Sequence, residues 1–211
     1  MTTSSYAVLA LLDLKPWTGY ELTNQARRSL RYAWPKSERL LYSVPKKLVE
    51  LGYATTYKEQ SDNLSRNVYE ITDSGRAALR DWTRTRTQPP HLEIEALLRL
   101  LFADHGTTDD LQGVLDELEA DIREEHDSVV ELMASYLDGG HPFPERTHLS
   151  VLFATFQIET FKSMLRWIEF ARSEISQWPT TENLGMTERT EMLTRLLGDG
   201  KFDLSNRPPG L

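Results

Sequence analysis

Between residues 36 and 47 the chain gathers side chains that could bind a polyanion. Lysine and arginine neutralise phosphate oxygens, and hydroxyl groups donate hydrogen bonds to phosphates or to the edges of nucleic-acid bases. A smaller polar group follows between residues 63 and 66. The candidate residues are Lys36, Ser37, Arg39, Tyr42, Ser43, Lys46 and Lys47 in the first group, and Asn63, Ser65 and Arg66 in the second.

The charge of the chain is unevenly distributed. The total of −8 argues against a polyanionic partner, yet residues 1–90 hold 14 basic and 9 acidic residues, a net charge of +5. Residues 91–211 hold 10 basic and 23 acidic residues, a net charge of −13. We therefore expect a polyanion to contact the first half only. Charge alone leaves an alternative open, in which the candidate residues form a solvated helix face and an ordinary polar turn.

Signatures of other chemistries are missing from the sequence. The chain has no cysteine, which excludes disulfides, thiol catalysis and thiolate metal sites. Its five histidines do not form an HExxH pattern, and no glycine-rich phosphate-binding loop occurs. We therefore expect no enzymatic activity, no metal and no cofactor. No apolar run approaches the roughly 20 residues of a membrane span, and the N-terminus lacks signal-peptide features. These patterns predict a cytoplasmic protein without a membrane partner.

Six elements, four helices and two strands, are predicted to position the basic residues. Thr18, Ser37 and Thr72 are expected as helix N-caps, with Glu21 three residues after Thr18. Tyrosine, threonine, valine and isoleucine favour strands on both sides of a polar turn. The predicted elements are helices over 5–14, 18–34, 36–52 and 72–85, and strands over 53–59 and 67–72 around a turn at 60–66.

This order of elements is typical of a winged helix-turn-helix domain, in which the third helix enters the major groove and the hairpin tip reaches the DNA backbone. Early residues of such a helix usually contact bases, so we expect Ser37, Arg39 and Ser43 at base edges. We assign the remaining candidates to the DNA backbone, with the hairpin residues at the backbone or in the minor groove. These are Lys36, Lys46, Lys47 and Tyr42 in the helix, and Asn63, Ser65 and Arg66 in the hairpin.

The remainder of the chain is predicted to be helical, over 92–104, 107–137, 146–177 and 187–197, the last capped by Thr187. The helix over 146–177 is apolar on two sides and, at about 1.5 Å per residue, spans about 45 Å. We infer that a second copy of the chain covers part of it. The residues expected to line either the dimer interface or an effector pocket, or otherwise to form only packed core, are Phe153, Phe156, Phe161, Leu165, Trp167, Ile168 and Trp178.

A set of spaced residues connects the first domain to a known family. The set comprises Gly19-Tyr20-Glu21-Leu22, Trp34-Pro35, Tyr42 ten residues before Gly52, Arg66, Tyr69, Thr72, Gly75-Arg76, Leu79 and Trp82. With these residues the chain resembles the PadR family of bacterial transcriptional regulators, and its helical remainder resembles the larger subgroup of that family in length and pattern. The resemblance implies a homodimer built by the C-terminal helices, bound to a roughly palindromic operator and often acting as a repressor. It also implies a small apolar or phenolic effector.

The sequence therefore predicts a mainly α fold with a small β-hairpin. A winged helix-turn-helix domain is expected over residues 1–88, an all-α dimerisation and effector domain over 89–198, and a loosely ordered tail over 199–211. The predicted function is a homodimeric transcriptional regulator that binds double-stranded DNA. The alternative is a winged-helix module that binds another protein and does not bind DNA.

Pro45 departs from the family pattern, which often has leucine three residues after the tyrosine. Proline removes a backbone donor and crowds the carbonyl four residues earlier. One interpretation has Ser43 cap a new helix that begins at Val44. The other has a single helix continue from Ser37 and kink near Leu41, and we expect this one.

Overall fold

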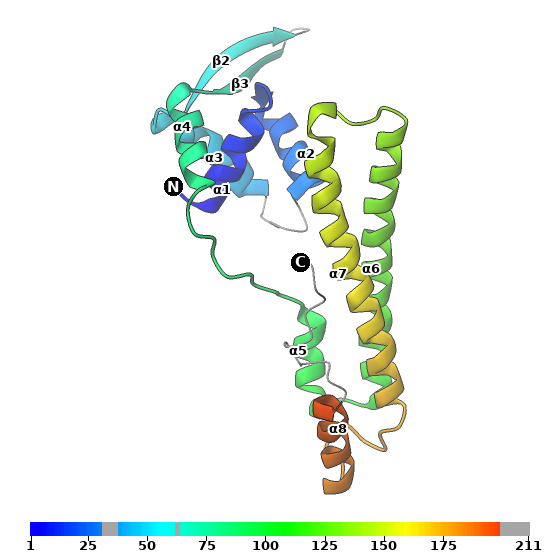
Figure 1. Ribbon diagram of the computed structural model, residues 1–211. Helices are drawn as coiled ribbons and strands as arrows, with labels where there is room; N and C mark the ends of the chain where they lie inside the picture. Colours follow the sequence, from blue (N-terminus) through cyan, green and yellow to red (C-terminus); the bar gives the residue numbers. More distant parts are fainter. Residues whose placement is uncertain (31–37, 62–63, 199–211) are drawn as a thin grey trace. The chain divides into compact units, whose positions relative to one another are not determined.

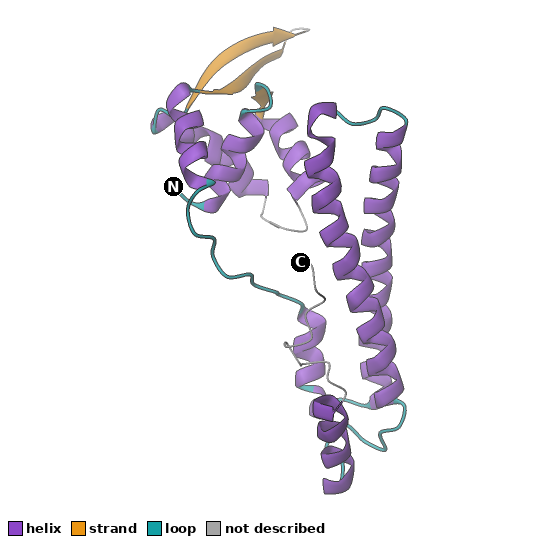
Figure 2. Ribbon diagram, in the orientation of Figure 1, coloured by secondary structure: helices purple, strands orange, loops and turns teal. Residues whose placement is uncertain are grey.

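The computed structural model describes residues 1–30, 38–61 and 64–198. It divides the chain into two compact units, Met1–Pro90 and His91–Leu211 (Figure 1). The fold is mostly helical with one small antiparallel sheet, which confirms the predicted fold class (Figure 2). Three of the candidate binding residues, Lys36, Ser37 and Asn63, lie outside the described residues.

The N-terminal unit packs four helices around one apolar core. They are α1 (Thr3–Leu12), α2 (Gly19–Leu30), α3 (Glu38–Glu50) and α4 (Asp73–Trp82). The largest side chains at the centre of this core include Leu9, Leu12, Leu22 and Leu48, which are fully buried. At the edge of the core the rings of Tyr6 and Trp82 stack with their centroids 5.0 Å apart, so they join α1 to α4.

Local hydrogen bonds set the starts of two of these helices as predicted. The Thr18 N–H and hydroxyl donate to the Glu21 carboxylate at 2.9 and 2.8 Å, and the Glu21 N–H donates to Thr18 Oγ1 at 3.2 Å. This reciprocal capping box satisfies donors that the first turn of α2 would otherwise leave free. At α4 the Thr72 hydroxyl accepts from the Gly75 N–H at 3.1 Å and donates to the Gly52 carbonyl at 2.8 Å.

The sheet has three strands in the order β1-β3-β2. They are β1 (Trp17–Thr18), β2 (Ala54–Ser61) and β3 (Leu64–Ile71), all antiparallel. The predicted turn over 60–66 is wrong, because both strands continue until Ser61 pairs with Leu64. Strand β1 was not predicted from the sequence. Its pairing of Trp17 with Tyr69 joins the base of the β2–β3 hairpin to the start of α2.

The C-terminal unit is built on two long helices. In α6 (Thr108–Leu137) and α7 (Thr147–Ile175) the chain runs up and back down, so that the two helices lie side by side (Figure 1). Thr107 and Asp110 form a capping box at the start of α6, and Gly139, with φ +80°, follows its end. The shorter elements are α5 (Glu95–Leu101), α8 (Met186–Gly198) and the 3-10 turns Ala103–His105 and Pro144–Arg146.

Two predicted helix boundaries in this unit were wrong. The helix predicted over 92–104 is only Glu95–Leu101, followed by a 3-10 turn. Thr187 was predicted as an N-cap, but α8 begins one residue earlier and includes it. Within the described ranges no helix is long and apolar enough to span a membrane.

One face of α7 packs along α6. Phe161, Ile168 and Ile175 are buried on that face, and Leu115 and Ile122 are buried on α6. Arg172 reinforces the contact, because its guanidinium donates to Asp116 and, at 2.7 Å, to Glu119. The buried face of α7 is therefore covered within a single copy of the chain.

Candidate nucleic-acid interface

Helix α3 has one buried and one exposed face. Val44, Pro45 and Leu48 lie in the core, whereas Lys46 and Lys47 are exposed beside them. Of the other candidates, Ser43 is also exposed, Tyr42 is 45% exposed, and Arg39 lies in the first turn of the helix. The core therefore anchors α3 while a face with two cations and hydroxyl groups meets solvent.

Helix α3 continues without interruption across Pro45. The interpretation in which Ser43 caps a separate helix is therefore wrong, and the kink near Leu41 stays a prediction. The proline ring is less than 2% exposed, so it fills core volume as an aliphatic side chain would. Burial of the ring offsets part of the cost of the backbone hydrogen bond that Pro45 cannot donate.

The candidate residues of the hairpin lie on strand β3. Ser65 pairs with Gln60 and Arg66 with Glu59, and the side chains of all four residues are exposed. Figure 2 shows β2 and β3 extending as a long ribbon away from the helices of the N-terminal unit. The hairpin thus has the form of a wing, with Arg66 on its outer half, two pairs inward from the Ser61–Leu64 pair.

A surface pocket of about 440 Å³ lies at the base of this wing. We call this cavity the wing-base pocket, and it is lined by Thr18, Gly19, Tyr20, Arg66, Asn67 and Tyr69. Of these residues, the sequence predicted only Arg66 as a binding residue. Gly19, Tyr20 and Tyr69 belong to the set that carries the family resemblance.

Glu21, which follows Tyr20 of the pocket in the sequence, has a pKa below that of an ordinary glutamate. Hydrogen bonds from the Thr18 N–H and hydroxyl lower the pKa of Glu21, and the positive charges of Lys15 and Arg66 lower that pKa further. Its carboxylate is therefore ionised at neutral pH and held against Thr18.

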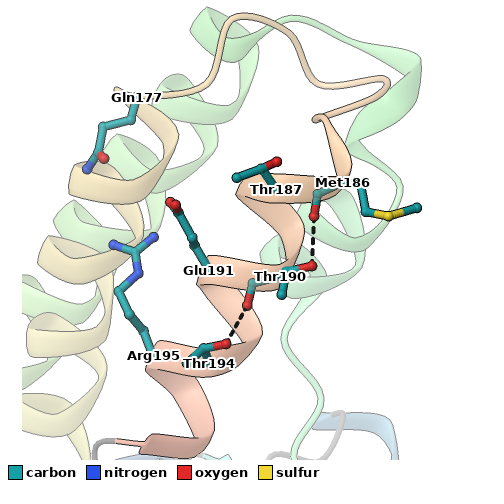
Figure 3. Close-up of a pocket in the computed structure, with 7 residues that line it drawn as sticks. All are labelled: Gln177, Met186, Thr187, Thr190, Glu191, Thr194 and Arg195. Carbon is teal, nitrogen blue, oxygen red and sulfur yellow. Dashed lines mark hydrogen bonds between the residues drawn. The ribbon is translucent and has the colours of Figure 1, made fainter.

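A second pocket, of about 670 Å³, lies between the end of α7 and α8 (Figure 3). Glu191 and Arg195 extend from α8 toward α7, and Arg195 donates to both oxygens of Glu174 at 3.0 Å. Six of its seven lining residues have polar side chains, and the aromatic residues predicted for an effector pocket are not part of it. Its residues are Gln177, Met186, Thr187, Thr190, Glu191, Thr194 and Arg195.

The residues predicted for a dimer interface or effector pocket occupy different environments. Phe161 and Ile168 are buried within the protomer, where α7 packs along α6. Phe156 is 69% exposed and Trp167 is 39% exposed. Phe153, Leu165 and Trp178 are partly buried. Phe156 and Trp167 belong to an exposed apolar stripe along α7, which also contains Leu149, Leu152 and Phe170.

The N-terminal unit, with three helices, a wing and a closing helix α4, is a winged helix domain. Residues 8–81 match the model of the transcriptional regulator PadR-like family. The chain therefore carries a PadR-like domain, and the resemblance inferred from the sequence is confirmed.

Known proteins resemble more of the chain than this domain. The negative transcriptional regulator PadR of Bacillus subtilis is 28% identical over 175 residues, which cover 80% of this chain and 95% of that protein. Its crystal structure in complex with operator DNA matches 82% of this chain and 99% of its own, with a TM-score of 0.69 and 22% identity. The crystal structure of smu.1604c from Streptococcus mutans covers 82% of this chain and 99% of its own, with a TM-score of 0.73 and 21% identity. At such identities the structural matches establish the fold.

Proposed function

We propose that this chain is a DNA-binding transcriptional regulator, acting as a repressor. The observation that carries the proposal is the exposed pair Lys46 and Lys47 on α3, whose opposite face is anchored in the core of a PadR-like winged domain. The Bacillus subtilis relative supports it, since that protein is a negative transcriptional regulator and has been solved with operator DNA. The proposal includes no catalytic activity and no cofactor, and it places the protein in the cytoplasm with the DNA.

In the proposed complex α3 enters the major groove and the wing follows the adjacent backbone. Ser43 and Arg39 belong to the groove-facing set, whereas Lys46, Lys47 and Tyr42 contact phosphates. Ser65 and Arg66 on β3 extend this contact to the wing. Lys36, Ser37 and Asn63 complete the proposed DNA-binding set.

The active form in this proposal is a homodimer joined through the C-terminal unit. The exposed stripe on α7 supports it, because a row of large apolar side chains along one helix is unfavourable in water and is typical of interfaces. Two copies would place their α3 helices in half-sites about one helical turn apart, roughly 34–36 Å, on a pseudo-palindromic operator.

A small apolar or phenolic effector is proposed to release the DNA. The Bacillus subtilis relative has been solved in complex with p-coumaric acid, a phenolic compound. Adding p-coumaric acid to the preformed protein–DNA complex tests this part of the proposal. Release of the duplex supports it, whereas an unchanged complex at saturating compound argues against this phenolic class.

Binding to the DNA upstream of the chain's own gene tests the central proposal. In the double variant Lys46→Ala, Lys47→Ala we expect weaker binding to all duplexes and a salt dependence whose slope falls by about two, one for each lost phosphate contact. The matched control is Lys162→Ala with Arg166→Ala on α7, which should bind like the wild type. An unchanged slope in the α3 variant would show that the two lysines do not contact DNA. If the wild type gives no mobility shift at low salt, the alternative of a protein-interaction module is favoured, in line with the net charge of −8.

A further inference from the structure

The wing-base pocket shares Arg66 with the wing contact proposed above, and its other lining residues lie outside the proposed DNA-binding set. We propose that it binds one phosphodiester group of the DNA backbone, with Arg66, Tyr20 and Asn67 as the contacting side chains. The inference rests on the proposed function and extends the wing contact from Arg66 to the start of α2. Thr18 and Tyr69, which are 8% and 7% exposed, form its floor.

The chemistry of the lining suits an anion. Arg66 is exposed, and within the described part of the chain it makes no ion pair, even with Glu59 opposite it on β2. The Tyr20 side chain is 67% exposed, so its hydroxyl is accessible, and Asn67 adds an amide that can donate. A planar guanidinium with hydroxyl and amide donors beside it is well suited to phosphate oxygens.

The Glu21 carboxylate, whose charge acts on Arg66, is held by hydrogen bonds to Thr18 and makes no ion pair with Arg66 within the described residues. Glu21 accepts both the N–H and the hydroxyl of Thr18. These features leave Arg66 as the charged group available to a ligand.

Gly19 places the pocket next to the proposed DNA-reading helix. A Cβ added at Gly19 would lie 3.7 Å from two ring atoms of Tyr42 on α3 and 4.0 Å from Tyr69 Cε2. Gly19, which lines the pocket, therefore lies next to the Tyr42 ring of α3. A backbone that passes from the major groove to the wing would cross this position.

The glycine also supplies a steric probe that leaves the fold intact. The added methyl group of Gly19→Ala would make only ordinary van der Waals contacts, and alanine is the better helix former. We expect this variant to keep the wild-type thermal stability or exceed it, while its methyl group occupies pocket space. Its affinity for a random-sequence duplex, measured by fluorescence anisotropy, should fall several-fold, with a salt slope smaller by about one.

A charge variant and its control complete the test. Arg66→Gln should lower the salt slope by about one, whereas Arg80→Gln on α4 removes the same charge from an exposed site outside the pocket and should have no effect. Combining Gly19→Ala with Arg66→Gln should cost no more affinity than the stronger single variant, because both remove the same contact. Additive losses, or a Gly19→Ala variant that binds like the wild type, would overturn the pocket assignment.

Two further outcomes separate this inference from its premise. A wild type that binds no duplex at low salt defeats the proposed function itself, whereas wild-type binding with unaffected variants defeats only the pocket. In a last experiment, inorganic phosphate is added to the protein–DNA complex at constant ionic strength. We expect the phosphate not to displace the duplex. Displacement from the wild type but not from Arg66→Gln would assign the pocket to free phosphate and overturn the DNA-backbone assignment.

Discussion

Glu21 combines two roles at the start of α2. It completes the capping box with Thr18, and its negative charge lies within reach of Lys15 and Arg66. A glutamine at this position could accept the same two hydrogen bonds but would carry no charge. The Glu21→Gln variant therefore separates the contribution of the hydrogen bonds from that of the charge.

We expect wild type and Glu21→Gln to differ in stability at neutral pH but not in acid. Hydrogen bonds from Thr18 lower the pKa of Glu21 in the folded state, so the extra stability is present above the ordinary carboxyl pKa and is lost as the pH falls through the lowered one. Chemical denaturation of both proteins at neutral and at acid pH measures the difference. If the two proteins differ by the same free energy of unfolding at both pH values, the charge of Glu21 contributes nothing to the stability of this cap.

Two helical glycines should respond oppositely to alanine. A Cβ at Gly75 would lie 2.2 Å from the Tyr53 carbonyl oxygen and 2.8 Å from Ile71 Cγ1, so Gly75→Ala should destabilise the N-terminal unit by about 1–3 kcal/mol. At Gly113 on α6 no atom lies within 4 Å, and Gly113→Ala should be neutral or stabilising by up to about 1 kcal/mol. Thermal unfolding of the two variants checks both signs. Equal changes in stability for the two variants would show that the atoms around Gly75 move apart to accommodate the added methyl group.

At the scale of elements, α3 carries a proline at its centre. Pro45→Ala would restore a backbone donor, and proline costs a helix interior about 3 kcal/mol relative to alanine. The loss of two buried methylene groups, about 0.8 kcal/mol each, offsets part of this gain. We therefore expect Pro45→Ala to be more stable by about 1 kcal/mol in urea denaturation. A destabilised variant would show that the packing of the ring outweighs the missing hydrogen bond.

The elements differ in how well the sequence predicts them. Helix starts at Thr18, Thr72 and Thr107 were predictable, because capping depends on residues within three positions of each other. By contrast, the strands in the outer half of the wing were not predictable from the sequence. Its described outer residues, such as Lys58 and Arg66, are exposed on both strands, so no alternation of apolar and polar residues marks it as a strand.

Long-range contacts account for the other failures of prediction. The pairing of Trp17 with Tyr69 joins residues far apart in the sequence, so β1 leaves no local pattern. Without β1 the wing-base pocket could not be assembled from the sequence either. Similarly, α7 is apolar on two sides, and only its packing along α6 shows that Phe161 is internal while Phe156 is exposed.

At the scale of the whole molecule, the exposed stripe on α7 predicts the oligomeric state. Phe156→Lys places a charge in the stripe, whereas Thr155→Lys places the same charge about 100° around the helix, on its polar side. We expect Phe156→Lys to weaken the dimer by a factor of about 30, equivalent to roughly 2 kcal/mol at an interface hot spot. Light scattering across a concentration series measures both variants. Identical dimerisation of the two would exclude the stripe from the interface.

The contact of Tyr42 with the Gly19 position also affects how a duplex could be selected. The exposed face of α3 and the wing-base pocket keep a set spacing there, because Val44 and Leu48 hold α3 in the close-packed core. Two contact surfaces at a fixed spacing fit only a groove of matching width. We therefore expect the domain to distinguish duplexes by shape at base pairs that it never touches, since stiff and deformable steps differ in the energy needed to fit one fixed width.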